Sequence, residues 1–275
     1  MSTASFVPIP SDRVDGPVAI VLARKDNATV GLALADGNST GAGKVRSFFV
    51  EPDHWGLGVG TGLLAALEVQ ATQLGFRSLE AMYETGGGRS QAPARLAARA
   101  GWTPSQPPTL VCRSSTRTIA AAPFMKHELK GDFEVFPWAE VSAAELAELR
   151  AVDPQNRWYP TSLSPLVQDY EPANSLGLRR GGRLVGWMIT HRLAPDLIRY
   201  TSLFVRTEER ALGPGMALLA AAIKRQTAAG IPNAIFGVGA ANQTMSKVLK
   251  KRLAPFLEDY REVSYVKKEL VQPPA

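Results

Sequence analysis

The sequence has little cysteine. Cys112 is the one thiol among 275 residues. A single cysteine excludes an internal disulfide and cannot by itself form a thiolate metal site, so we expect a reducing compartment and no bound metal. Cys112 lies in an alternating run, residues 109–112, where a small buried strand residue is the ordinary interpretation.

Long apolar runs and clustered charges are also missing. No stretch of about 18 apolar residues occurs without charge, and the first residues, MSTASFVPIPSDR, do not show a basic segment followed by an apolar one. We therefore expect a cytoplasmic protein that does not enter a membrane. The net charge is +6, but Lys and Arg are scattered, so we expect no nucleic-acid partner. A basic balance also suits an anionic cofactor.

What the chain does contain is an internal repeat. An offset of 155 positions aligns FFVEPDHWGLGVGTGLL, residues 48–64, with LFVRTEERALGPGMALL, residues 203–219. The matched positions include a Phe-Val pair and two glycines, which are not part of a helix pattern, so we interpret the repeat as a duplicated unit. A length of 275 residues suits two domains, which we expect at 1–120 and 121–275.

Each half has the same expected order of elements. In the first half we predict strands at 18–23, 29–35, 44–50 and 78–84, a helix from the glycines to Gly75 and a second helix at 92–100. In the second half we predict strands at 175–180, 183–192, 197–205, 234–238 and 261–270 and helices at 215–229 and 242–252. A leading strand at 133–136 and a helix at 142–151 are expected in the second unit alone.

The repeated segment is a strand that turns through glycines into a helix. Such a turn leaves backbone N–H groups unpaired at the positive end of a helix dipole, where phosphate binds. A dinucleotide fold is disfavoured because three strands precede the turn and Gly56, Gly58, Gly60 and Gly62 are evenly spaced. A mononucleotide loop would need Gly-Lys-Ser or Gly-Lys-Thr. A purely structural role in tight turning stays an alternative.

At this point the residues resemble a known family. Val50-Glu51-Pro52 and then Gly58-Val59-Gly60 are similar to the V-x-P and [RQ]-x-x-G-x-[GA] motif of the Gcn5-related N-acetyltransferases, and RALGPG at 210–215 resembles it in the second half. Residues 96–102 and 242–248 echo the family's next helix. The resemblance implies an α/β (α+β) fold with two tandem units, each a mixed, largely antiparallel sheet flanked by helices. It also implies acetyl-CoA, or another acyl-CoA, as co-substrate.

The resemblance assigns the pyrophosphate of the cofactor to backbone amides of the two turns. In the first half Trp55 stands where the family has Arg or Gln, and in the second Thr207 replaces the proline and Pro214 has no N–H. We favour the first half as the cradle because its amides are intact. The expected cofactor-binding residues are Phe49, Val50, Trp55, Gly56, Leu57, Gly58, Val59, Gly60, Thr61, Val205, Arg210, Gly213 and Gly215.

The implied reaction is direct attack of an amine on the thioester carbonyl, which needs a base, an oxyanion donor and an acid for the thiolate. The tyrosine that often serves as this acid in the family falls on Ala97 in the first half and Leu249 in the second. Tyr83 and Glu84, at a strand end, are substitute candidates, and Tyr200 is their equivalent in the second half. Ordinary packing of these side chains is the alternative.

The acceptor is expected to be a primary amine of a small molecule or peptide. It could bind against the second unit, where Trp158, Tyr159 and Asp153 cluster, although these residues could equally plug the core. A non-catalytic acyl-CoA-binding or scaffold protein is a second hypothesis, because both halves lack the tyrosine. We expect a monomer or a homodimer.

Overall fold

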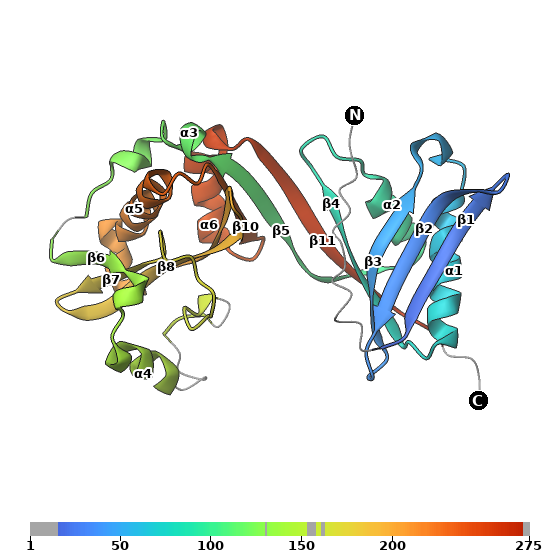
Figure 1. Ribbon diagram of the computed structural model, residues 1–275, viewed down its shortest axis with the longest axis horizontal. Coiled ribbons are helices and arrows are strands. Elements are labelled where there is room, and N and C mark those ends of the chain that lie inside the picture. The colour runs from blue at the N-terminus through green and yellow to red at the C-terminus, as the bar shows by residue number, and fades with distance from the viewer. Residues whose placement is uncertain (1–15, 130, 153–157, 161–162, 272–275) are drawn as a thin grey trace. The chain divides into compact units, whose positions relative to one another are not determined.

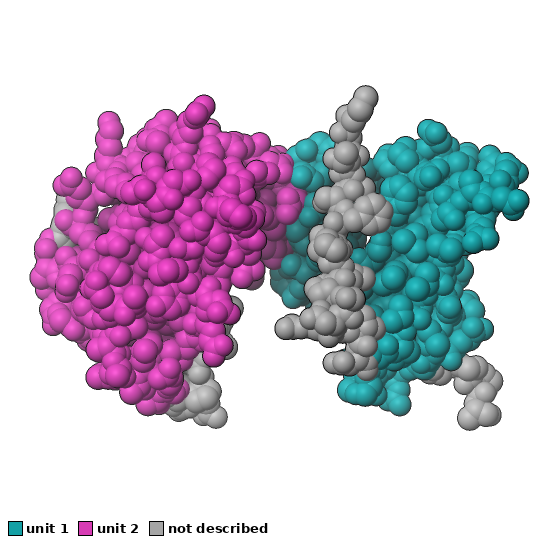
Figure 2. All heavy atoms as spheres, in the orientation of Figure 1, with its two compact units in different colours: residues 1–108, 262–275 teal, residues 109–261 magenta. Residues whose placement is uncertain are grey.

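The structure is a computed structural model that describes residues 16–129, 131–152, 158–160 and 163–271. Contacts divide the chain into two compact units (Figure 2). Unit 1 comprises Met1–Pro108 and Glu262–Ala275, and unit 2 comprises Thr109–Arg261. None of the helices in the described ranges is both long and apolar enough to cross a membrane.

The described strands of unit 1 form a mixed sheet in the order β1-β2-β3-β4-β11 (Figure 1). Every neighbouring pair is antiparallel except β3 and β4, which run parallel. Helix α1 packs on β1, β2 and β3, and α2 packs on β4. The bounds are β1 Val18–Lys25, β2 Ala28–Gly37, β3 Ala42–Val50, α1 Val59–Gln73, β4 Ser78–Thr85, α2 Ala92–Arg99 and β11 Asp259–Glu269.

Helix α1 has a clear apolar face and a clear end. Leu63, Leu64, Leu67 and Ala71 are buried against the sheet, as their helical spacing predicts. Gly75 has a positive φ of 85°, and its N–H donates to Thr72 O while Phe76 N–H donates to Ala71 O. These two bonds form the glycine-terminated C-cap that the sequence predicted, and Gly230 and Ile231 repeat it after α5.

The described strands of unit 2 have the order β5-β10-β9-β8-β7-β6. The pair β9 and β10 is parallel, and the pairs β5–β10, β8–β9, β7–β8 and β6–β7 are antiparallel. The strands are β5 Thr103–Ser115, β6 Phe133–Pro137, β7 Leu176–Arg180, β8 Arg183–Ala194, β9 Leu197–Val205 and β10 Asn233–Gly239. The helices are α3 Thr116–Ile119, α4 Ala143–Ala151, α5 Pro214–Ala228 and α6 Gln243–Val248, which continues as a π-helix at Leu249–Leu253.

The two sheets differ in how their faces are covered. Strand β8 is buried on both faces from Leu184 to Thr190, because one core forms beneath α5 and another beneath α4. Strand β1 of unit 1 instead alternates, with Val18, Ile20 and Leu22 exposed. Among the described residues no strand or helix precedes β1, so the leading strand and helix of unit 2 have no described counterpart there.

The two repeats exchange their last strands. Residues of β5 beyond Pro108 pair with β10 in unit 2, whereas residues 262–269 of β11 pair with β4 in unit 1. The division of the chain therefore differs from the boundary that the sequence places after residue 120. An alternating pattern predicts that a segment is a strand, but it does not identify the sheet edge that the strand joins.

Most predicted elements lie within a few residues of those observed, and the fold class is confirmed as two units with mixed, largely antiparallel sheets flanked by helices. The predicted helix at 242–252 is the main local difference. It is α-helical only to Val248 and then widens into the π-helix. Helix α4 follows the prediction closely because Ser142 and Glu145 form a capping box at its start.

Strand β11 is anchored in unit 1 by a mostly buried ion pair. Lys268 Nζ lies 2.6 Å from Glu68 Oε2 on α1 and donates to Ala100 O at 2.7 Å. Glu68 Oε1 also accepts from Trp102 Nε1 at 2.8 Å. One carboxylate therefore ties the exchanged strand to both helices of the unit.

We expect Glu68→Ala to lower the free energy of unfolding of the protein by about 1–3 kcal/mol, because Trp102 Nε1 loses its acceptor and Lys268 loses its counter-ion, keeping only its bond to Ala100 O. Urea unfolding followed by circular dichroism measures the change. Gln73→Ala, at an exposed position near the end of the same helix, is the matched control and should alter stability little. Equal effects of the two substitutions would contradict the anchoring role of Glu68.

Candidate functional site

Each unit contains two parallel strands that part along their length. In unit 1, β3 and β4 pair only from Ala42 with Ser78 to Lys44 with Glu80. Beyond that point β3 continues along β2, and β4 continues along β11. In unit 2, β9 and β10 pair only over residues 197–200 and 233–236. Backbone groups on the facing edges are then available to an extended ligand rather than to a neighbouring strand.

A β-bulge lies at the same repeat position in both units. The β2–β3 register passes from Leu34/Ser47 to Ala35/Val45, so Arg46 is the extra residue. The corresponding extra residue in β9 is Thr201, which lies 155 positions later in the sequence. Because a bulge bends and twists its strand, it accounts for the parting of the strands, which begins within two residues of it.

The glycine turn of unit 1 presents a row of free donors. Gly56 and Gly58 have φ values of 77° and 84°, a conformation that glycine adopts without strain, and α1 begins immediately afterwards. The first hydrogen bond of the helix runs from Gly62 N–H to Gly58 O. The backbone N–H groups of residues 56–61 donate to no acceptor in the described part of the chain. This segment contains six of the nine first-half residues expected to bind the cofactor, while Phe49, Val50 and Trp55 precede it.

The turn of unit 2 is built differently. Residues Thr207–Leu212 form a 3-10 helix, and Gly213 N–H donates to Arg210 O at 3.1 Å. Pro214 begins α5 and has no N–H, while Met216 N–H bonds to Gly213 O. Of residues 213–216, Gly215 alone keeps a donor without an acceptor in the described chain. The difference follows from the sequence, since the first turn has glycines at 56 and 58 where the second has Ala211 and Gly213.

Trp55 and Arg210 make the same hydrogen bond. Trp55 Nε1 donates to Val50 O at 2.7 Å, and Arg210 Nε donates to Val205 O at 2.8 Å. Both carbonyls belong to the last residue of the bulged strand, and both donors lie at equivalent repeat positions. Trp55 therefore replaces the Arg without loss of the bond that ties the turn to the strand. What unit 1 loses at this position is positive charge.

Tyr83 and Glu84 point to opposite faces of β4, as successive strand residues do. Tyr83 packs against the core beneath α1 and α2. Glu84 is exposed and lies 3.4 Å from Arg89 Nε. The structure therefore does not bring these two candidates to the same side of the sheet. Ala97 and Leu249, at the family's tyrosine position, are buried.

Tyr200 lies in a buried polar network of unit 2. Its hydroxyl donates to Gln226 Oε1 at 2.7 Å and accepts from Asn174 Nδ2 at 3.3 Å. Burial raises the pKa of Tyr200 above its ordinary value, with the Asn174 hydrogen bond opposing the shift. These contacts fit a packing role, which was the alternative interpretation of this tyrosine.

The predicted acceptor cluster belongs to the core beneath α4. Tyr159 is 2% exposed, its hydroxyl donates to Leu149 O, and its ring packs edge-on against Trp187. Trp158 contacts the same Trp187 ring and lies beneath the guanidinium of Arg206. These contacts agree with the plug interpretation. Asp153 lies outside the described residues.

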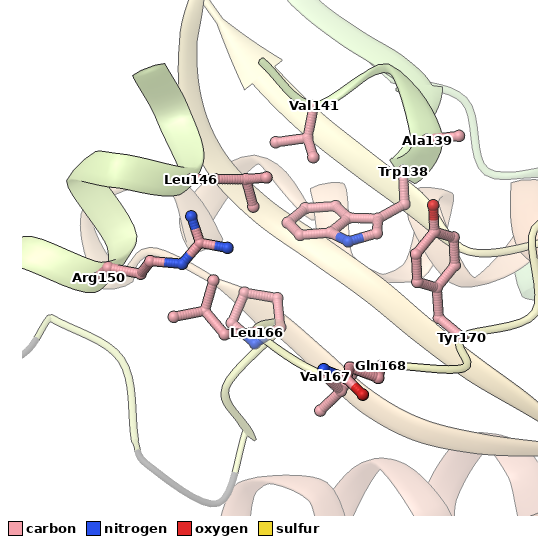
Figure 3. Close-up of a pocket in the computed structure, with 10 residues that line it drawn as sticks. Trp138, Ala139, Val141, Leu146, Arg150, Leu166, Val167, Gln168 and Tyr170 are labelled. Carbon is pink, nitrogen blue, oxygen red and sulfur yellow. The ribbon is translucent and has the colours of Figure 1, made fainter. Parts of the chain in front are cut away.

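Sequence reasoning missed a hollow of about 330 Å³ beside α4 (Figure 3). Its residues come from three separate segments of unit 2, so no local motif could have indicated it. The lining residues are Trp138, Ala139, Val141, Leu146, Arg150, Pro165, Leu166, Val167, Gln168 and Tyr170.

We expect Tyr200→Phe to destabilise the protein by about 1–2 kcal/mol, because Gln226 Oε1 and Asn174 Nδ2 each lose a buried partner. Thermal or urea unfolding measures the change. Tyr83→Phe is the matched control, since no hydrogen bond of the Tyr83 hydroxyl is recorded in the described chain, and it should leave stability nearly unchanged. A stable Tyr200→Phe variant would remove the packing explanation and return this hydroxyl to the catalytic candidates.

Comparison with known proteins agrees with this architecture. Residues 5–102 match the model of the acetyltransferase (GNAT) family. No curated protein matches the sequence significantly. The structure of the tandem GNAT protein from the clavulanic acid biosynthesis pathway has a TM-score of 0.60 at 16% identity, over 93% of this chain and 85% of that one.

Two further solved structures have the same fold. A GCN5-related N-acetyltransferase from Sphaerobacter thermophilus gives a TM-score of 0.62 at 18% identity, over 94% of this chain and 82% of that one. A glucosamine N-acetyltransferase region of a fungal multi-domain GH3 β-N-acetylglucosaminidase gives 0.53 at 16% identity, over 91% and 33%. Residues 5–102 therefore belong to the acetyltransferase (GNAT) family, and the chain as a whole has the fold of its tandem proteins.

Proposed function

We propose that this protein is an acyl-CoA-dependent N-acyltransferase of the cytoplasm. It transfers acetyl from acetyl-CoA to a primary amine of a small molecule or peptide, and unit 1 binds the cofactor. The observation that carries the proposal is the row of N–H groups at residues 56–61 that donate to no described acceptor, just after a strand that parts from its neighbour. The family match covers the same segment.

The pyrophosphate would lie on these amides and at the positive end of α1. Amide dipoles carry this interaction, because Trp55 supplies no charge. The acyl arm would follow the open edge of β3. Glu51 N–H donates to Val30 O on β2, so by alternation the N–H and C=O groups of Phe48 point away from β2 into the opening. The Phe48 N–H is thus a candidate donor to the thioester oxygen as it gains negative charge.

In the transfer itself the amine nitrogen bonds to the thioester carbon, the carbon–sulfur bond breaks, and the amine's proton leaves while the thiolate is protonated. Tyr83 stays the candidate acid on the core face of β4. Glu84 could act as base only if its interaction with Arg89 is exchanged for one with the amine.

Gly60 and Gly215 offer a matched test of the two turns. They occupy equivalent helical positions, and a Cβ added to either would find its nearest neighbour at 3.7 Å, an ordinary contact. We expect Gly60→Glu to weaken acetyl-CoA binding at least about tenfold, because its carboxylate repels the phosphates at the helix start. Isothermal titration calorimetry measures the affinity.

Gly60→Gln, which adds the same bulk without charge, should stay within about threefold of the wild type. Gly215→Glu should bind normally. The reverse result for the two glutamates would move the cradle to unit 2. A wild-type protein that binds no acyl-CoA would refute the proposed function.

A second prediction concerns the Trp55 bond. Trp55→Phe should weaken acetyl-CoA binding about 3- to 10-fold, the loss expected when one neutral hydrogen bond no longer holds the turn. Trp55→Arg restores a donor of the kind that Arg210 supplies and should regain the affinity. Gln73→Ala, at an exposed position near the far end of α1, is the control. Unchanged binding by Trp55→Phe would show that the turn does not need this bond.

The alternative is a non-catalytic acyl-CoA-binding or scaffold protein. It is favoured by one specific observation: Ala97 and Leu249 are buried apolar side chains where the family has a catalytic tyrosine. Binding without release of free CoA across a panel of small amines and peptides would support it. Release of CoA that depends on an amine, and that falls in Tyr83→Phe, would support the enzyme.

A further inference from the structure

The hollow beside α4 carries hydrogen-bond donors that lack acceptors. Its volume of about 330 Å³ is within the range of small-molecule sites, and its lining combines apolar side chains with polar groups. No Asp or Glu is among its lining residues. The hollow lies wholly in unit 2 and is made by the 3-10 turn after β6, by α4 and by the segment 165–170.

The first donor is the indole N–H of Trp138. This side chain is 3% exposed, and its ring packs edge-on against Trp187 at 6.4 Å. Its Nε1–H donates to no acceptor in the described residues. Figure 3 shows the ring nitrogen on the edge that faces Val167 and Gln168, across the hollow. The nitrogen is not among the fully buried polar atoms without a partner, so its N–H can donate to an acceptor that enters the hollow.

The second donor is the guanidinium of Arg150. It lies on the last turn of α4 and makes no ion pair or hydrogen bond within the described chain. Figure 3 shows the guanidinium turned toward Trp138 rather than away from the hollow. Asp169 lies between the lining residues Gln168 and Tyr170 in the sequence, but it is not itself part of the lining. Arg150 therefore gives the hollow a positive charge that no lining carboxylate neutralises.

We propose that this hollow binds a small organic acid. Its carboxylate would accept from Trp138 Nε1–H and from Arg150, and an apolar or aromatic body would lie against Leu146, Leu166 and Tyr170. A planar carboxylate matches a guanidinium in two parallel hydrogen bonds. A cationic ligand is disfavoured by Arg150. A phosphate with two negative charges is disfavoured because one guanidinium would leave one of those charges without a partner. The site is independent of acyl-CoA binding.

Titration of the full-length, ¹⁵N-labelled protein with phenylacetate tests the proposal. The chain has five tryptophans, so Trp138→Phe identifies the indole signal of Trp138 by its loss. We expect a saturable shift of that signal with phenylacetate. Phenylacetamide, the neutral analogue, should bind at least about tenfold more weakly because it lacks the charge-assisted bond, and 2-phenylethylamine should not bind.

Arg150→Gln should weaken phenylacetate binding at least about tenfold, and it should fold normally because Arg150 is exposed and makes no ion pair or hydrogen bond with another described residue. Arg225→Gln, an exposed arginine on α5, is the matched control and should bind as the wild type does. Failure of the Trp138 signal to shift, equal binding of acid and amine, or unchanged affinity in Arg150→Gln would each overturn the proposal. All three measurements are made without acyl-CoA, so they do not depend on the proposed function.

Discussion

The candidate site of unit 1 depends on backbone groups that make no hydrogen bond to a neighbouring described strand or helix. Parallel pairing of β3 with β4 stops at Lys44 and Glu80, and in the turn that follows β3 the N–H groups of residues 56–61 donate to no acceptor among the described residues. Unpaired backbone groups are normally avoided in folded proteins. They persist here because the bulge at Arg46 bends β3 and two positive-φ glycines hold the turn.

Duplication preserved the strand geometry better than the turn. The bulge, the parted strands, the strand-end hydrogen bond and the glycine C-cap recur 155 residues apart. The donors do not recur, because the 3-10 helix and Pro214 remove most of them in unit 2. Features that hold the sheet together are shared by both copies, whereas the feature that would hold phosphate is confined to one.

Much of the fold could be predicted from the sequence because it depends on local patterns. Alternation gives the strands, and Gly75 marks the end of α1. The exchange of β5 and β11 could not be predicted, since it depends on which distant edge each strand joins. The glycine turn itself could be predicted from its glycines, but the Trp55 bond could not, because it depends on the direction in which Val50 O points. The hollow was beyond sequence reasoning because Trp138, Arg150 and Tyr170 meet only in the folded unit.

Trp55 and Arg210 occupy equivalent positions but differ in charge, so they distinguish two roles of this motif position. An arginine there can tie the turn to its strand and also add positive charge near a phosphate. An indole has one N–H donor and no charge, so it can tie the turn to its strand but cannot add positive charge. Because the bond to Val50 O is retained at 2.7 Å, the turn of unit 1 keeps its shape while its attraction for anions rests on amide dipoles. Dipoles act over a shorter range than a full charge, so the proposed binding at this turn would require the phosphates to lie directly on residues 56–61.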